Sequence, residues 1–402
     1  MTNRTSAFLV TFLTIFIDLL GFGIVIPIVP HFLKNILQEP ESIIGITVGI
    51  YSLMQFIFTP VWGSLSDVYG RKPILIMSLS GNVISYILMA LAFSGLLPSM
   101  TLLVISRALA GIFSANLSAA QSVVSDLTTK DERSRGMGII GAAFGLGFVI
   151  GPALGGVLSF NFGYSVPVLA SAGFSTIALL LCITIFKETL PPEVQKLNKK
   201  NFKGVTLINI KGLKDILSNK KVGVFIIIFF FITFSFANIH ATFLLFAERK
   251  DGLNMSEQGV GLLLSYLGIV ASFVQGFLIK YFKKWLGEEK SLITGNFITA
   301  IGLALIPLSN NLFILLIVLF ILAFGNGLNN PMVLGLISEN TEQIEQGSVL
   351  GVNQAMGSLA RFLGPVWGGI VFQSLGYQFP FWSGAFFMIL ITVFSLRIIK
   401  NS

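Results

Sequence analysis

Two stretches of the chain decide its fold, because they repeat one another. Residues 151–167 read GPALGGVLSFNFGYSVP, and residues 364–380 read GPVWGGIVFQSLGYQFP. When the chain is shifted by 213 positions, residues 132–167 align without a gap on residues 345–380, and eleven positions are identical. Self-similarity at one fixed offset is typical of an internally duplicated architecture. The sequence therefore predicts two related halves.

The composition indicates that both halves lie in a membrane. Of the 402 residues, 54% are hydrophobic and only 11% are charged, whereas soluble domains carry about 25% charged residues. A helix needs about 20 largely apolar residues to span a bilayer. By that criterion twelve spans are expected, at residues 7–30, 43–66, 73–95, 99–122, 136–158, 164–186, 222–246, 257–280, 290–308, 311–336, 346–372 and 377–398. The fold class is thus an all-α membrane protein of two six-helix bundles.

The basic residues predict the orientation and the boundary between the halves. If both termini face the cytoplasm, the cytoplasmic segments hold 21 of the 26 Lys and Arg residues, as the positive-inside rule requires. The segment from Lys187 to Lys221 carries nine of them. We therefore expect an N-terminal half over residues 1–187, a solvated basic linker over 188–221 and a C-terminal half over 222–402, in a cell membrane. The apolar segment ending near Pro30 is too long for a signal peptide and reads as a retained helix.

Several classes of function are excluded. The net charge of +8 resides mostly in short loops between apolar segments, which argues against a nucleic-acid partner. One cysteine, Cys182, and two histidines leave no disulfide framework and no metal centre. The nucleotide-binding Gly-rich loop ending in Lys-Ser/Thr is missing from the sequence, so we expect no ATP drive, no cofactor and no enzyme activity.

Asp18 is the strongest candidate for a functional residue. It lies halfway along the first span and is the only carboxylate placed deep in the membrane. A charge at the bilayer centre costs about 2.5–3.5 kcal/mol on insertion scales, and such residues usually mark ion or substrate pathways. Arg107 in the fourth span is its expected partner, because a buried Arg keeps its charge and requires an anion or acceptor dipoles. Proton coupling would follow if the approach of Arg107 expels a proton from Asp18. A permanent structural ion pair is the alternative.

A glycine stripe marks the fifth span. Gly147, Gly151 and Gly155 recur every four residues, with Pro152 and Gly156 beside them. This spacing places the three glycines on one helix face, where a neighbouring helix can approach closely.

The loop after the second span carries a more specific signature. It reads GSLSDVYGRKP over residues 63–73, with Gly63, Asp67, Gly70 and Arg71 at the defining positions. This pattern resembles the loop signature of the major facilitator superfamily, which implies that superfamily's fold of two pseudo-symmetric six-helix bundles. The resemblance implies a gate in which Arg71 pairs with Asp126 and in which Asp67 faces the helix N-terminus near Gly347. The corresponding loop of the second half starts at Gly276 and has Lys280 in place of the acid.

The resemblance extends to the drug:proton antiporters of the superfamily. The Gly-Pro-x-x-Gly-Gly run at residues 151–156 is similar to their antiporter motif, and residues 16–24 resemble the first helix of the tetracycline-exporter branch. That branch carries an acid, a histidine and another acid where this chain has Ser85, Ala271 and Thr299. Because of these departures, the resemblance does not identify the substrate.

Other polar residues within the spans are candidates for a substrate cavity. They are Gln55, Asn116, Asn238, His240, Asn326, Asn353 and Arg361. Hydrogen bonds between helices are the alternative for the amides. His240 fits a wall residue, and Arg361 fits either an anionic substrate group or a cap on backbone carbonyls.

These features together predict a secondary transporter. We expect export of a drug-like or amphipathic small molecule in exchange for protons, with the proton gradient as the energy source, by a monomer in the lipid bilayer. A proton symporter or uniporter for a sugar or an organic anion is the alternative, and a non-transporting membrane scaffold on the same fold is a third possibility.

Overall fold

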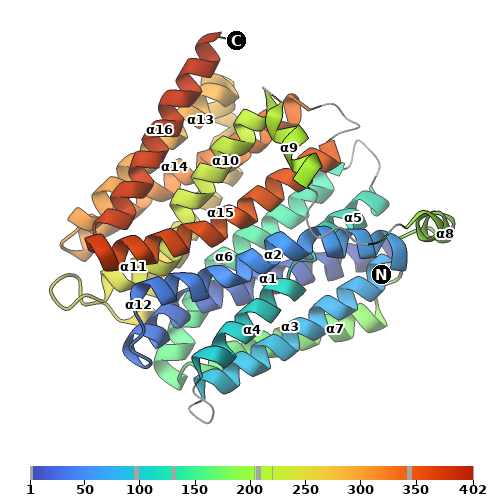
Figure 1. Ribbon diagram of the computed structural model, residues 1–402, viewed down its shortest axis with the longest axis horizontal. Helices are drawn as coiled ribbons and strands as arrows, with labels where there is room; N and C mark the ends of the chain where they lie inside the picture. The colour runs from blue at the N-terminus through green and yellow to red at the C-terminus, as the bar shows by residue number, and fades with distance from the viewer. Residues whose placement is uncertain are drawn as a thin grey trace. The chain divides into compact units, whose positions relative to one another are not determined.

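The computed structural model describes residues 3–94, 99–128, 133–202, 204, 210–219, 221–341 and 346–401. These residues are organised as helices (Figure 1). In chain order they are α1 (Asn3–Asn35), α2 (Glu41–Tyr69), α3 (Arg71–Phe93), α4 (Met100–Phe113), α5 (Leu117–Leu127), α6 (Arg133–Phe162), α7 (Ser165–Thr184), α8 (Pro192–Asn201), α9 (Ile210–Ser218), α10 (Val222–Ala237), α11 (Ile239–Ala247), α12 (Glu257–Phe273), the π-helix η1 (Val274–Leu278), α13 (Ile279–Leu305), the 3₁₀-helix η2 (Ile306–Leu308), α14 (Leu312–Glu339), α15 (Gln346–Leu375) and α16 (Phe379–Asn401). The aligned repeat positions Glu132 and Glu345 lie outside the described residues, as do linker positions 203, 205–209 and 220.

The predicted membrane spans are recovered as long apolar helices. Eleven stretches among the described residues are long and apolar enough to cross a membrane. One of them, Glu257–Leu308, is 52 residues long and has non-helical backbone at Gly287, with φ 77° and ψ 172°. This interruption separates the two spans predicted at 257–280 and 290–308. The all-α fold of twelve spans is thereby confirmed, and the chain is an integral membrane protein.

The described chain forms two compact units. Unit 1 contains Met1–Ile28 and Ile50–Asn209, and unit 2 contains Val29–Gly49 and Ile210–Ser402. Residues 29–49 belong to unit 2, and they pack closely against α15 at two glycines, Gly45 and Gly369. A Cβ atom built on Gly45 would lie 2.2 Å from the carbonyl oxygen of Pro365, and one on Gly369 would lie 2.2 Å from that of Glu41. The predicted boundaries at residues 187 and 221 stay a prediction.

Unit 1 is held together by α3, which packs against α4 and α7 (Figure 1). Its apolar side chains form several small clusters, one of which joins Leu75 and Leu79 of α3 to Ala178 and Cys182 of α7. The opposite face of α3 leaves Ile84 and Ile87 exposed, at 55% and 44%. An apolar residue exposed along a spanning helix is suited to lipid.

Unit 2 has one large core. Helix α13 packs against α14 and α16, and α10 packs against α15. Aromatic residues contribute much of this core, including Phe243 and Phe381, which are fully buried. On α16, Phe386 and Ile389 are exposed at 57% and 48%, and they too form a lipid-facing surface.

Candidate functional site

Asp18 lies at the centre of a buried polar cluster in unit 1. Its side chain is 5% exposed. One carboxylate oxygen accepts a hydrogen bond from the amide of Asn82 on α3, and the other accepts one from Asn116 Nδ2 at 2.9 Å. Ser114 Oγ donates to Asn82 Oδ1 at 3.1 Å, and the amide of Asn116 also donates to Ser78. We call these five residues the Asp18 cluster.

A break in the fourth span positions this cluster. The predicted helix 99–122 is divided into α4 and α5, and the connecting residues include Ser114 and Asn116. Side chains of neighbouring helices donate to carbonyl groups at this break. Trp62 Nε1 donates to Ile112 O at 2.6 Å, Ser78 Oγ donates to Phe113 O at 2.6 Å, and Gln55 Nε2 donates to Ser114 O at 3.3 Å. Irregular backbone at membrane depth is tolerated where it is buried in protein or lines a cavity.

The position of Arg107 differs from the expected one. Its side chain is 2% exposed, and its guanidinium carbon lies 5.1 Å from the ring centroid of Tyr51 and 5.9 Å from that of Phe22. Arg107 is not among the partners described for Asp18. One amide donor contacts each carboxylate oxygen of Asp18, and the predicted Asp18–Arg107 ion pair is absent from the described contacts in this conformation. Cation–π contacts stabilise a buried guanidinium by about 2 kcal/mol. The part of Arg107 in proton coupling stays a prediction.

Tyr86 is a polar residue that the sequence did not single out. It is 2% exposed, and no hydrogen-bond partner is described for its hydroxyl group. A Cβ atom at Gly21 would lie 1.8 Å from that oxygen, so Gly21 leaves the space that the phenol occupies. Its neighbour Ser85, which stands at the acid position of the tetracycline-exporter branch, donates to the carbonyl oxygen of Gly81 at 2.7 Å.

The glycine stripe on α6 packs against α1, the helix that carries Asp18. A Cβ atom at Gly147 would lie 2.7 Å from Leu19 Cβ, one at Gly151 would lie 2.8 Å from Gly23 Cα, and one at Gly155 would lie 2.3 Å from the carbonyl oxygen of Ile24. Pro152 lies on the same side, because its Cδ is 3.1 Å from the position of a Cβ at Gly23. Gly156 is buried beside it. The two backbones approach as closely as the spacing predicts.

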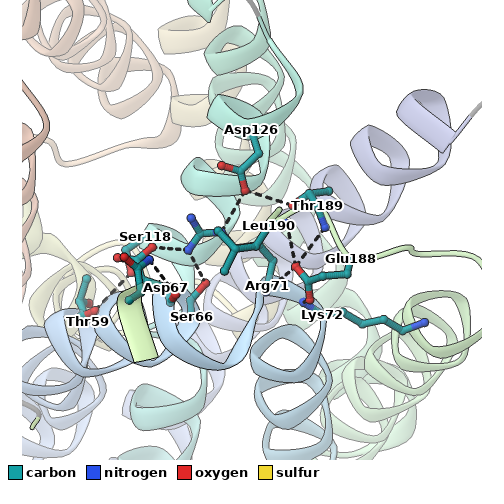
Figure 2. A network of polar contacts seen from close by, with 11 residues as sticks. Thr59, Ser66, Asp67, Arg71, Lys72, Ser118, Asp126, Glu188, Thr189 and Leu190 are labelled. Atoms are coloured by element: carbon teal, nitrogen blue, oxygen red, sulfur yellow. Dashed lines mark hydrogen bonds and ion pairs between the residues drawn. The ribbon is translucent and has the colours of Figure 1, made fainter. Parts of the chain in front are cut away.

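Residues 63–73 are organised by Arg71 (Figure 2). We call them the gating loop after the role that the resemblance implies, although α2 extends to Tyr69 and α3 begins at Arg71. The guanidinium group is 6% exposed and contacts two acids. Nε lies 3.0 Å from Asp126 Oδ2, and Nη1 lies 2.5 Å from Asp67 Oδ1. Nη1 also donates to Ser66 Oγ at 2.9 Å, and a Cβ at Gly63 would meet Ser118 Oγ at 3.1 Å. The loop and the end of α5 are thereby joined through one cation. The expected approach of Asp67 to the helix near Gly347 would join the two units and stays a prediction.

Glu188 completes the gating loop and was missed by the sequence analysis. It follows α7, and its two carboxylate oxygens accept from the backbone N–H groups of Arg71 and Lys72 at 2.9 and 3.0 Å (Figure 2). These groups lie at the N-terminus of α3, where an anion is stabilised by unpaired donors and the helix dipole. Gly70 has φ 104°, and a Cβ there would lie 2.5 Å from Glu188 Oε2. Gly70 is therefore required both by the turn and by the carboxylate. The only signal in the sequence is an acid directly after the sixth span.

The beginning of the predicted linker contacts the same loop. Thr189 Oγ1 donates to Asp126 Oδ2 at 3.2 Å, and Asn198 Nδ2 on α8 donates to the carbonyl oxygen of Asp67 at 3.0 Å. Lys199 Nζ lies 5.7 Å from the ring centroid of Tyr69. The expectation of a solvated loop is therefore incomplete, because this part of the linker is a helix that contacts the gating loop.

The second half repeats part of these networks. The 213-residue shift places Glu339 on Asp126, and Lys283 lies 3.6 Å from Glu339 and contacts Glu288. An ion pair thus persists there, although Lys280 replaces the acid.

The same shift places Ser291 on Ser78 and Asn329 on Asn116, but Phe231 on Asp18. Both polar residues of the second half are fully buried. Gly295 and Gly327 stand at the positions of Asn82 and Ser114, so the second half repeats two of the four polar partners and lacks the acid.

The structure distributes the cavity candidates over both units. Gln55 and Asn116 lie at the Asp18 cluster in unit 1. In unit 2, Asn238 Nδ2 donates to Pro380 O at 2.6 Å, and Arg361 Nη2 donates to Ser358 Oγ at 2.9 Å. The remaining candidates are buried, namely His240 at 6%, Asn326 at 8% and Asn353 at 3%. Their part in substrate binding stays a prediction, and the bond of Asn238 to Pro380 supports the alternative of an interhelical hydrogen bond.

Comparison with known proteins identifies the family. The profile of the Major Facilitator Superfamily matches residues 11–287 and 241–402. The chain is 31% identical to multidrug resistance protein 2 of Bacillus subtilis, over 97% of this chain and 94% of the relative. It is 28% identical to the class H tetracycline resistance protein of Pasteurella multocida, over 95% of this chain and 92% of the relative. It is 30% identical to the class E tetracycline resistance protein of Escherichia coli, over 90% of this chain and 87% of the relative.

Solved structures agree in fold. The human organic anion transporter MFSD10 superposes with a TM-score of 0.72 at 22% identity, over 98% of this chain and 100% of that one. The nucleoside transporter NupG superposes with a TM-score of 0.74 at 14% identity, over the whole of both chains. The helical architecture, the matched profile and relatives in the drug-resistance group thus agree, and this chain belongs to the Major Facilitator Superfamily and is a transporter rather than an enzyme.

Proposed function

We propose that the protein is a proton-coupled antiporter that exports drug-like or amphipathic small molecules by alternating access. The observation that carries this proposal is the Asp18 cluster, a membrane-embedded carboxylate held by asparagine amides beside a break in a helix. The tetracycline and multidrug resistance proteins among the relatives support export. No cofactor is needed, because the proton gradient supplies the energy.

The contacts of Asp18 suit a group that exchanges a proton. Removing an ionised carboxylate from water is costly unless it is neutralised or paired with a cation, and the partners described for Asp18 are neutral amides. A proton can therefore take the place of a counter-ion in this conformation. In the other conformation Arg107 approaches Asp18 and the proton leaves. The buried guanidinium then exchanges its contacts with Tyr51 and Phe22 for an ion pair.

The gating loop supplies the second element of alternating access. Arg71 binds Asp126 on α5 and Asp67 within the loop at the same time, so movement of α5 relative to the loop requires the Arg71–Asp126 ion pair to break. Glu188 and α8 add further contacts on the same side. We propose that this side faces the cytoplasm, that both termini lie there, and that a monomer in the cell membrane is the functional unit.

The test compares two acids in everted membrane vesicles. With respiration driving protons inward, the wild type accumulates its substrate, identified beforehand by a growth screen against toxic compounds that includes tetracycline. We expect Asp18→Asn to abolish accumulation and to retain exchange of labelled for unlabelled substrate. Asp251→Asn is the matched control, because Asp251 is an exposed loop acid with a 76% exposed side chain. Uncoupler-sensitive accumulation by Asp18→Asn would refute proton coupling at this residue.

Uptake of a metabolite is the second candidate, favoured by one observation. Arg361 is a partly buried cation on α15, and an ionisable residue within a membrane span usually marks a substrate or ion pathway, so it suits an anionic substrate group. The direction of flux separates the candidates, because a symporter would move its substrate out of everted vesicles along with the protons rather than accumulate it. Expression that protects cells from no compound, together with inward flux in whole cells, would replace export by uptake.

A further inference from the structure

A second cluster of titratable side chains lies at the C-terminal end of α1. His31 contacts two glutamates of unit 2, one through each ring nitrogen. Nδ1 is in direct contact with Glu248 Oε1, and Nε2 lies 3.1 Å from Glu257 Oε2. Asn35, one turn further along α1, donates to Glu248 Oε2 at 3.1 Å. None of these residues was a site candidate in the sequence.

The three titratable residues come from three helices. Glu248 is the C-terminal cap residue of α11, and Glu257 lies in the first turn of α12. The side chains of His31, Glu248 and Glu257 are 20%, 14% and 7% exposed. The cluster therefore joins the end of α1 to α11 and α12 in a largely buried position that water still reaches at the histidine.

The hydrogen-bonding capacity of the three groups favours one bound proton in the cluster. An ionised carboxylate only accepts hydrogen bonds, and a neutral imidazole has one N–H group and one lone pair. Without an added proton, a ring that donates to one glutamate presents its lone pair to the other carboxylate, which is repulsive. With the proton, both ring nitrogens carry N–H groups, so the Nδ1 contact with Glu248 and the ion-pair contact of Nε2 with Glu257 are both attractive. Neutral His31 facing a protonated Glu248 is the alternative placement of the same proton.

The neighbouring cations do not replace this proton. Lys34, also on α1, pairs with Glu41 at 2.6 Å, and Arg249 pairs with Asp251 at 2.7 Å. Each therefore already has an acid of its own. The charge that His31 carries thus affects how strongly the two glutamates attract the end of α1.

We propose that His31, Glu248 and Glu257 form a proton-binding site that holds the end of α1 to α11 and α12 while the proton is bound. Release of the proton to water leaves two carboxylates facing a neutral ring and loosens the contact. His31 lies 13 residues after Asp18 in the sequence of α1. The site is independent of the proposed antiport. In the orientation proposed above it lies on the outer side, where it would sense external pH.

The chain has two histidines, so each can be observed separately. The protein is labelled with ¹⁵N-histidine, incorporated into lipid nanodiscs and titrated from pH 5 to pH 9 by NMR. His240→Gln leaves the His31 ring as the one signal and is the matched control, because His240 is a buried α11 residue outside the cluster. We expect both His31 nitrogens to be protonated at pH 7, and Glu248→Gln to lower the pH of half-protonation by about one unit.

A second measurement tests whether protonation of His31 holds the end of α1 against α11 and α12. Hydrogen exchange of the backbone amides in residues 29–36 and 248–260 is followed across the same pH range and corrected for the intrinsic exchange rate. Protection should fall about tenfold above the His31 transition in the wild type and in His240→Gln. It should be independent of pH in His31→Gln, and Glu257→Gln should reduce the change without abolishing folding.

Two results would overturn the proposal. The first is a His31 ring with one unprotonated nitrogen at pH 7 whose titration Glu248→Gln leaves unchanged. The second is protection that does not change while the ring titrates. Neither result bears on proton coupling at Asp18, since the vesicle experiment measures that separately.

Discussion

Replacing Gly155 by alanine tests the close packing of α6 on α1. The Cβ atom of Gly155→Ala would lie 2.3 Å from the carbonyl oxygen of Ile24, whereas ordinary contact begins near 3.4 Å. The obstacle is backbone, which cannot rotate away as a side chain can. The two helices must therefore separate by about 1 Å at this point, the difference between those two distances.

The expected cost follows from overpacking. Forcing an extra carbon into a close-packed site costs about 1–3 kcal/mol, partly offset by the gain of up to about 1 kcal/mol when alanine replaces glycine in a helix. Gly141→Ala is the matched control on the same helix, because nothing lies within 4 Å of its Cβ. That variant should be as stable as the wild type or slightly more stable.

The assay is thermal unfolding of the purified variants in the same detergent, followed by transport in proteoliposomes. We expect Gly155→Ala to unfold at a lower temperature than Gly141→Ala and to transport more slowly, because α1 carries Asp18. Equal stability of the two variants would refute the reasoning, since it would mean that α6 and α1 do not approach as closely as the glycine contacts require.

Three further predictions concern the gating loop. Gly70→Ala should destabilise the protein by about 1–3 kcal/mol, because the positive-φ backbone of Gly70 is adopted almost only by glycine and because Glu188 occupies the space of the added carbon. Unchanged thermal unfolding in detergent would contradict this. Glu188→Gln should cost about 0.3–1 kcal/mol through the lost charge at the helix N-terminus, and Glu188→Ala should cost more because both backbone donors lose their acceptor; equal losses in thermal unfolding would exclude capping. Asp126→Asn should leave the Arg71 guanidinium with Asp67 as its one acidic partner among the described contacts. If the Arg71–Asp126 ion pair restrains α5, the labelling rate of a cysteine introduced into α5 should rise about tenfold. An unaltered labelling rate would show that Asp126 does not restrain this helix.

Sequence patterns predicted the spans well because a bilayer imposes a strict length and polarity on each helix. The glycine stripe on α6 was equally predictable, because spacing of four places Gly147, Gly151 and Gly155 on one face whatever their neighbour is. What the pattern could not supply was that neighbour, and the structure identifies it as α1.

The Asp18 cluster was predictable only in part. A lone acid in an apolar span is visible in the sequence, as is a buried arginine. Their pairing is predicted from charge alone and stays a prediction, and the structure shows Asn82 and Asn116 as donors to Asp18 in this conformation. A break in a helix has no strong signal when small and polar residues surround it, so the division of the fourth span at Asn116 was missed.

The sequence by itself determined the membrane class, the duplication, the positions of the spans and the identity of Asp18 as the embedded acid. These properties follow from local composition and from spacing along one chain. The tertiary structure decided which groups meet: Glu188 with the N-terminus of α3, α8 with Asp67, and His31 with Glu248 and Glu257. Such contacts join residues more than 100 positions apart, and they depend on helix packing, which no local pattern encodes.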